Sequence, residues 1–178
     1  MGASPKTTDF LKECMADAIL QAMQEKPFSK ITIHEIAEMA GVNRSTWFRN
    51  FSDKNEAISF KLIRLWNRWA DEHGLKERRR YTLGNAEDFF AFNFSIREIL
   101  SEIYREELQA CVYNAFYQVM MPQCGADPAA CYEARFYSYG LFGFLNEWIK
   151  RGFHETPEQI TELFRRMMRS AGSGHSPV

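Results

Sequence analysis

The sequence reads ITIHEIAEMAGVNRSTWFRNF from Ile31 to Phe51, and this stretch decides the fold. Thr32 and Glu35 have the spacing of a capping box, which predicts a helix that begins directly after Thr32. Gly41 can adopt the left-handed conformation that ends a helix, because it has no Cβ. Asn43 can cap a second helix through its side-chain oxygen. The stretch therefore predicts two short helices joined by a tight turn.

The second helix is rich in side chains that can form hydrogen bonds. They are Arg44, Ser45, Thr46, Arg49 and Asn50. Trp47 and Phe48 are bulky enough to hold this helix against its neighbours. A helix, a glycine turn and a short polar helix form the layout of a helix-turn-helix, whose second helix lies in the major groove of DNA.

Several of these residues have two interpretations. Arg44 and Arg49 can form paired hydrogen bonds to guanine or single bonds to phosphate, and one of them can equally be a solvated surface charge. Asn50 either ends the helix or contacts a base. Lys54 is expected at the start of the next helix, where backbone N–H groups and the helix dipole attract a phosphate. The charge run KERRR at 76–80 is either a solvated loop or an auxiliary phosphate contact.

The charge of the chain favours a nucleic-acid partner only locally. Its 178 residues carry a net charge of −1, whereas three basic residues and one acidic residue between Gly41 and Lys54 give a local charge of +2. A hydrophobic fraction of 46% and an aromatic fraction of 15% exclude a mainly disordered chain. So many aromatic residues can fill a core, line a pocket or form an oligomer interface.

The sequence does not indicate a membrane protein, a secreted protein or an enzyme. No apolar run approaches the roughly 18–20 residues that span a bilayer, and we expect no signal peptide. Serine-hydrolase, phosphate-loop, zinc-protease and dinucleotide-binding motifs are absent, so we expect neither catalysis nor a cofactor. Cys14, Cys111, Cys124 and Cys131 form no C-x-x-C pair and have no histidine at ligand spacing. We therefore expect buried free thiols, no metal site and a cytoplasmic location, with a redox pair of Cys124 and Cys131 as the alternative.

The remaining pattern predicts an all-α protein of about nine helices. We expect a three-helix helix-turn-helix domain at 7–53, a long connecting helix at 54–74, and a C-terminal regulatory and dimerisation domain at 75–170. A glycine ends the connecting helix at Gly74. The sequence TPEQ at 156–159 predicts the start of the last helix, because it combines a first-turn proline with a capping box.

These motifs resemble those of the tetracycline-repressor (TetR) family of bacterial transcriptional regulators. The strongest resemblance covers TIHEIAEMAGV, TWFRNF and DKNEAI between Thr32 and Ile58, and a weaker one covers YGLFGFLNEWIKRG from Tyr139 to Gly152. The resemblance implies an all-helical homodimer with an N-terminal DNA-binding domain and a small-molecule pocket in the C-terminal domain. Together with the residues chosen above, the expected DNA contacts are Thr32, Asn43, Arg44, Ser45, Thr46, Phe48, Arg49, Asn50 and Lys54.

The chain departs from the family pattern at two positions. Phe48 stands where the family usually has a tyrosine whose hydroxyl holds a phosphate, and its absence removes about 0.5–1.5 kcal/mol of hydrogen bonding per subunit. Trp47 stands where the family usually has leucine or phenylalanine. We interpret Trp47 as facing the core, with a groove contact as the alternative.

Two candidate sites follow for the C-terminal domain. The aromatic residues that can line a ligand cavity, or alternatively fill the core, are Trp66, Trp69, Phe90, Phe94, Tyr104, Tyr113, Phe116, Tyr117 and Phe136. Gly140 and Gly143 allow close helix approach, either across a symmetric dimer or within one subunit. The expected dimer interface consists of Gly140, Leu141, Gly143, Phe144, Trp148, Leu163, Phe164 and Met167.

We therefore expect a homodimeric transcriptional regulator, and more narrowly a ligand-responsive repressor of a palindromic double-stranded DNA operator. A small-molecule effector would favour a dimer shape in which the two recognition helices no longer match half-sites one turn apart. The alternative is a coactivator or interaction protein of the same fold that acts mainly through a protein partner. The missing tyrosine hydroxyl and the slightly acidic overall charge keep that alternative open.

Overall fold

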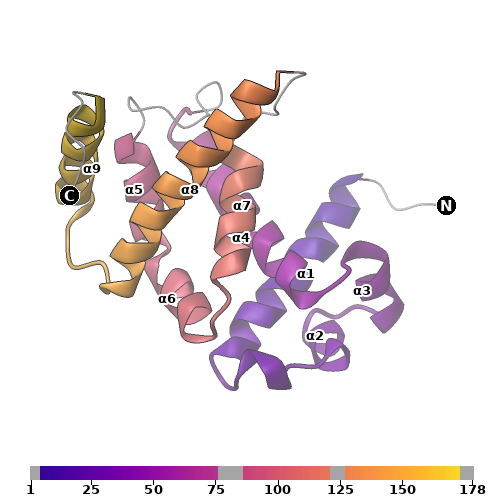
Figure 1. The fold of residues 1–178 in the computed structure, drawn as a ribbon. Helices are drawn as coiled ribbons and strands as arrows, with labels where there is room; N and C mark the ends of the chain where they lie inside the picture. Colours follow the sequence, from indigo (N-terminus) through magenta and orange to yellow (C-terminus); the bar gives the residue numbers. More distant parts are fainter. Residues whose placement is uncertain (1–4, 76–85, 121–126, 173–178) are drawn as a thin grey trace. The chain divides into compact units, whose positions relative to one another are not determined.

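The structure is a computed structural model and describes residues 5–75, 86–120 and 127–172 (Figure 1). Within these ranges the chain forms nine α-helices, one turn of 3₁₀ helix (η1) and no strand, which confirms the all-α fold class. The elements are α1 (Pro5–Met23), η1 (Phe28–Lys30), α2 (Ile33–Met39), α3 (Arg44–Asn50), α4 (Lys54–Glu72), α5 (Ala86–Ser95), α6 (Arg97–Arg105), α7 (Gln109–Met120), α8 (Pro128–Lys150) and α9 (Pro157–Gly172).

The helices gather into two compact units. The first contains Met1–Arg68 and Glu102–Ala115, and the second contains Trp69–Ser101 and Phe116–Val178. The division falls inside α4, α6 and α7, so these three helices run from one unit into the other. In this division a segment from the second half of the chain, Glu102–Ala115, belongs to the first unit.

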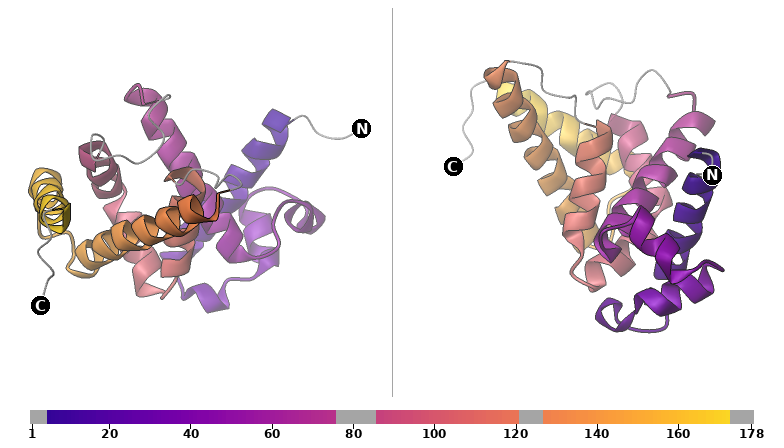
Figure 2. Two further views of the ribbon diagram at one scale, coloured as in Figure 1. Left: turned by 45° about the horizontal axis from the view of Figure 1, so that its top comes forward. Right: turned by 90° about the vertical axis from the view of Figure 1, so that its right-hand side faces the viewer.

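In the first unit, α1, α2 and α3 pack around a shared apolar core (Figure 2). Ile19 of α1, Ile36 of α2 and Trp47 of α3 are fully buried there. The capping box at the start of α2 is confirmed. The Glu35 N–H donates to Thr32 Oγ1 at 3.3 Å, and the Thr32 N–H donates to the Glu35 carboxylate at 3.5 Å. Local sequence therefore sets the start of α2, and burial fixes its orientation.

The turn between α2 and α3 follows the expected pattern at one residue and not at another. Gly41 has a φ of +65°, which confirms the left-handed turn after α2. Asn43 precedes α3 but makes no capping hydrogen bond through its side chain, so the expected Asn43 cap is wrong. The next helix, α4, is capped by Asp53, whose Oδ1 accepts from the Glu56 N–H at 2.8 Å.

The second unit is built around aromatic rings. Phe90 of α5 is fully buried, with its ring centroid 5.6 Å from that of Trp148 in α8. The indole N–H of Trp148 donates to the Glu155 carbonyl at 3.1 Å, which ties α8 to the connection that leads into α9. The capping box of α9 is confirmed, since Thr156 and Gln159 exchange hydrogen bonds at 2.9 and 3.3 Å. α5 and α9 lie side by side in this unit (Figure 1).

Candidate nucleic-acid interface

Helix α3 has one buried side and one exposed side. Trp47 is only 1% exposed, and its ring centroid lies 5.2 Å from that of Phe51. This confirms the interpretation of Trp47 as a core residue. The opposite side of α3 leaves Arg44, Ser45 and Phe48 exposed. The buried indole therefore holds the helix from behind while these three side chains face outward.

Three of the expected contact residues are engaged within α3 itself. Thr46 is buried, and its Oγ1 accepts a hydrogen bond from the Arg49 guanidinium at 3.3 Å. The Asn50 side chain donates to the Thr46 carbonyl at 2.7 Å, which is the helix-ending role. Arg49 also donates from Nε to the Ser45 carbonyl at 3.3 Å. Its guanidinium is exposed but lies along the helix.

Arg44 and Phe48 form a stacked pair on the exposed side of α3. The guanidinium carbon of Arg44 lies 5.4 Å from the centroid of the Phe48 ring, within the range of a cation–π contact. Among the described residues, the Arg44 guanidinium has no hydrogen bond or ion pair. The Phe48 ring is 60% exposed. The helix therefore offers a guanidinium with its donors free beside an apolar ring.

Thr32 and Asn43 are the two expected DNA contacts that lie outside α3 and α4, and both are accessible to solvent. Thr32 is exposed, and although its Oγ1 accepts from the Glu35 N–H, its hydroxyl proton stays available to a phosphate. A hydrogen bond from Lys26 lowers the pKa of Glu35, so a carboxylate stays charged beside Thr32. Asn43 is exposed as well. Both Thr32 and Asn43 can therefore still reach DNA.

Lys54, one of the expected DNA contacts, is engaged inside the protein. Its Nζ donates to the carbonyl of Phe28 at 2.6 Å and to that of Ile31 at 2.8 Å, and it lies 4.2 Å from the centroid of the Phe28 ring. Burial lowers the pKa of Lys54. The ammonium thus holds the connection between η1 and α2. No local pattern could reveal this, because the two acceptors lie 26 and 23 positions earlier in the chain.

A carboxylate from the second half of the chain holds the same connection from another side. Oε2 of Glu106, in the turn between α6 and α7, accepts from the Phe28 N–H at 2.7 Å. Nearby in sequence, the Cys111 carbonyl accepts from the Ser59 hydroxyl at 3.1 Å. Both contacts belong to the first unit. We call the contacts of Lys54 and Glu106 with the Phe28 backbone the Phe28 clamp.

The nine aromatic residues expected at a ligand cavity do not share one environment. Trp66, Phe90 and Phe116 are buried, and Phe116 packs its ring 5.7 Å from that of Phe89. Phe136 is 76% exposed. The partly exposed ones are Trp69, Phe94, Tyr104, Tyr113 and Tyr117.

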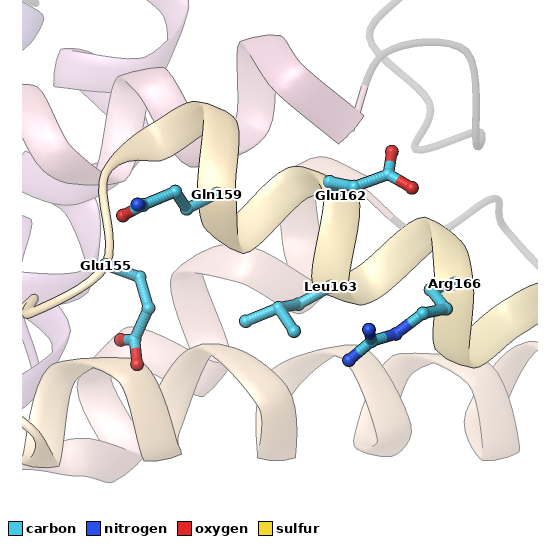
Figure 3. Close-up of a pocket in the computed structure, with 5 residues that line it drawn as sticks. All are labelled: Glu155, Gln159, Glu162, Leu163 and Arg166. Atoms are coloured by element: carbon cyan, nitrogen blue, oxygen red, sulfur yellow. The ribbon is translucent and has the colours of Figure 1, made fainter.

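A depression in the second unit has a different lining. It measures about 450 Å³ and is lined by Glu155, Gln159, Glu162, Leu163 and Arg166 (Figure 3). None of the nine aromatic residues is among them. Four of these five residues lie on α9, and Figure 3 shows their side chains on the part of that helix that lies above α8.

The residues of the expected dimer surface on α8 and α9 differ in their exposure. A Cβ added at Gly140 or Gly143 would meet no atom within 4 Å, so packing within the subunit does not require either glycine. Leu141, Trp148 and Phe164 are buried within the subunit and can add no area to a dimer contact. Phe144 is partly exposed. The large apolar side chains that are exposed on these helices are Tyr132, Phe136, Tyr137, Tyr139, Leu163 and Met167.

The sequence analysis did not include Tyr132 in the expected dimer surface, although its spacing from the two glycines indicated it. Tyr132, Phe136, Gly140 and Gly143 follow the i, i+4, i+8, i+11 pattern that places residues on one face of a helix. Phe136 and Tyr132 lie one and two turns before Gly140 on the same face of α8, so they extend the surface around the two glycines.

Other kinds of site find little support in the described ranges. No group of three His, Cys, Asp or Glu side chains there is arranged to hold a metal ion, and none of the helices is long and apolar enough to cross a membrane. Cys111 is buried, and burial raises its pKa to about 11, so its thiol stays protonated. Cys14 and Cys131 are partly exposed, and neither forms a disulfide within the described ranges. Cys124 and the charge run at 76–80 lie outside the described residues.

Comparison with protein families agrees with this geometry. Residues 16–57 match the family model of "Bacterial regulatory proteins, tetR family", and this match contains all of α2 and α3. Residues 86–170 match the TetR type of "Transcriptional regulator C-terminal region", which begins at α5 and ends within α9. A search of curated proteins finds no match. The exposed side of α3 and the two family matches together show that the chain belongs to the tetR family of DNA-binding transcriptional regulators.

Proposed function

We propose that the protein is a homodimeric, ligand-responsive repressor that binds a palindromic operator through two copies of α3. The observation that carries the proposal is the exposed side of α3, with Arg44, Ser45 and Phe48 on a helix that the buried Trp47 fixes in place. The N-terminal residues of a recognition helix are those that reach base edges. A helix surface that is already rigid before DNA binds loses little conformational entropy on binding.

A second copy of the chain is the partner that best suits α8 and α9. Gly140 and Gly143 are exposed and leave room for the close approach of a symmetry-related helix. Tyr132 and Phe136 add aromatic surface on the same face of α8, and aromatic residues are enriched at protein interfaces. Exposed apolar surface of this kind favours association.

The charges in the depression beside α8 and α9 also suit a two-fold contact. Oε1 of Glu155 binds Arg151 at 3.2 Å, whereas its Oε2 is buried without a hydrogen-bond partner among the described residues. Arg166 lines the same depression, and its guanidinium has no ion pair within the described ranges (Figure 3). In a two-fold contact residue i meets residue j and j meets i, so the exposed Arg166 of each subunit can meet a carboxylate of the other.

A ligand response requires that the second unit affects α3. Three helices, α4, α6 and α7, run from one unit into the other. The Phe28 clamp ties the turn after α6 to the connection that precedes α2. A ligand that binds one arrangement of these helices more tightly shifts the population toward it. If that arrangement changes the separation of the two α3 helices, operator affinity falls.

The test combines a sedimentation experiment with selection from randomised double-stranded DNA. We expect dimers that enrich an inverted repeat with half-sites about 10 base pairs apart, centre to centre, or a multiple of that. Affinity should fall steeply with salt, because phosphate contacts release counterions. Transcription from a promoter that overlaps the selected operator should decrease when the protein is added, and a ligand that releases the operator should restore it.

Other outcomes of this test are equally informative. A monomer, or a dimer that activates transcription, overturns the corresponding part of the proposal. A dimer that enriches no DNA sequence favours action through a protein partner, for which the exposed Phe48 and the slightly acidic overall charge leave room.

A further inference from the structure

Fewer side chains of α3 are available to contact DNA than its polar sequence indicates. Thr46 is buried, and the side chain of Asn50 is bound to the helix backbone. Arg49 is held along the helix by the Ser45 carbonyl and by Thr46 Oγ1. What remains at the start and middle of the exposed side is Ser45 and the stacked pair of Arg44 and Phe48.

The two members of this pair have complementary chemistry. The Arg44 guanidinium has five N–H donors in a planar fork, which matches the O6 and N7 acceptors of guanine in the major groove. Phe48 has no hydroxyl and therefore cannot hold a phosphate by a hydrogen bond. The apolar group that the major groove presents to such a ring is the C5-methyl of thymine.

The geometry allows both contacts at once. Arg44 precedes Phe48 by one helical turn, and its guanidinium carbon lies 5.4 Å from the centroid of the Phe48 ring. Neighbouring base pairs are about 3.4 Å apart, so the separation of the two groups suits adjacent base pairs better than distant ones. The stack also limits the motion of a long side chain, so less rotamer entropy is lost when the guanidinium meets a base.

We propose that Arg44 and Phe48 act as one unit that selects a guanine and a neighbouring thymine in each half-site. In this unit Phe48 reads a base, whereas the usual tyrosine of the family at this position holds a phosphate. The inference rests on the proposed function, since it requires that the chain binds operator DNA.

The experiment begins with the operator selected from randomised DNA by the wild-type protein. Each half-site should contain the thymine next to guanine. Replacing that thymine with deoxyuridine removes only the methyl group and keeps the base pair. Affinity measured by fluorescence anisotropy should fall about fourfold per half-site, equivalent to about 0.8 kcal/mol for one buried methyl group.

Three variants separate the two contacts. Phe48→Ala should bind the thymine and deoxyuridine operators equally, whereas Phe48→Tyr, which keeps the ring, should still prefer thymine. Arg44→Lys keeps the charge but loses the planar fork. It should keep the salt dependence and lose roughly five- to 140-fold of discrimination in favour of guanine.

A matched control addresses the general effect of removing an exposed aromatic residue. Phe10 on α1 is 66% exposed, and Phe10→Ala should leave the selected sequence unchanged. Thermal unfolding of all variants should resemble that of the wild type, because both members of the pair are exposed.

Equal wild-type affinity for thymine and deoxyuridine, or an unchanged preference in Phe48→Ala, overturns the inference while sequence-specific binding persists. Failure of the wild-type protein to select any sequence is a different result, and it overturns the proposed function itself.

Discussion

Replacing Lys54 with methionine is expected to destabilise the fold and to leave phosphate contacts intact. The change keeps an unbranched side chain but removes two hydrogen bonds from the ammonium, at 2.6 Å to the Phe28 carbonyl and at 2.8 Å to the Ile31 carbonyl. A hydrogen bond that involves a charged group contributes about 1.5–3 kcal/mol. Lys54 is only partly buried, so water can replace part of each bond. Taking the lower value for each bond gives an expected loss of about 3 kcal/mol in the free energy of unfolding.

The measurement is urea unfolding followed by circular dichroism, combined with operator affinity as a function of salt. Lys30→Met is the matched control, because Lys30 is exposed and lies in η1, next to Ile31. It should change stability by less than about 0.5 kcal/mol. The salt slope of Lys54→Met should equal that of the wild type. A variant that unfolds like the wild type but loses about one unit of salt slope per subunit would refute this reasoning, because that is the signature of a phosphate contact.

Three other changes test separate parts of the molecule. Trp47→Ala should lower the free energy of unfolding by about 3–5 kcal/mol, because it truncates a fully buried aromatic residue; normal thermal stability with altered operator preference would instead place Trp47 in the groove. Replacing Gly140 and Gly143 together with leucine should give monomers in sedimentation velocity without loss of helical content, since both positions are open within one subunit; persistent dimers would mean that the interface lies elsewhere. Glu56→Gln should reduce sensitivity to acid. Hydrogen bonds from Ser52 lower the pKa of Glu56 below 4.5, so its stabilising contribution is present above pH 4.5 and is lost as the pH falls through the lower folded-state pKa. The idea fails if urea unfolding shows the same loss of stability in wild type and variant between about pH 5 and pH 3.

Short-range patterns predicted several of the helix ends. The capping boxes that begin at Thr32 and Thr156 each join residues three positions apart, so they can be read directly from the sequence. Gly41, Gly74 and Gly152 have φ values of +65°, +69° and +71°, just beyond the ends of α2, α4 and α8. The burial of Trp47 was also accessible, because helical spacing sets it opposite the polar side of its helix.

Contacts between distant segments could not be predicted in this way. Phe90 and Phe136 are both phenylalanines on helices, yet one is fully buried and the other is largely exposed. Their environments depend on which helices meet, and spacing along one helix does not contain that information. The same limit hid the two carbonyl acceptors of Lys54, which lie 26 and 23 positions earlier in the chain.

The Phe28 clamp has a consequence for the construction of chimeric regulators. Glu106 lies 78 positions after Phe28, and Cys111 lies 52 positions after Ser59, yet all four residues belong to the unit that contains α3. A single crossover after α4 would transplant α3 without Glu106 and leave the Phe28 amide without its carboxylate acceptor. A graft that keeps both contacts must carry Glu102–Ala115 together with the first 68 residues. The unit that contains α3 and both of these contacts is therefore discontinuous in the gene, and three crossovers, after residues 68, 101 and 115, are needed to move it intact.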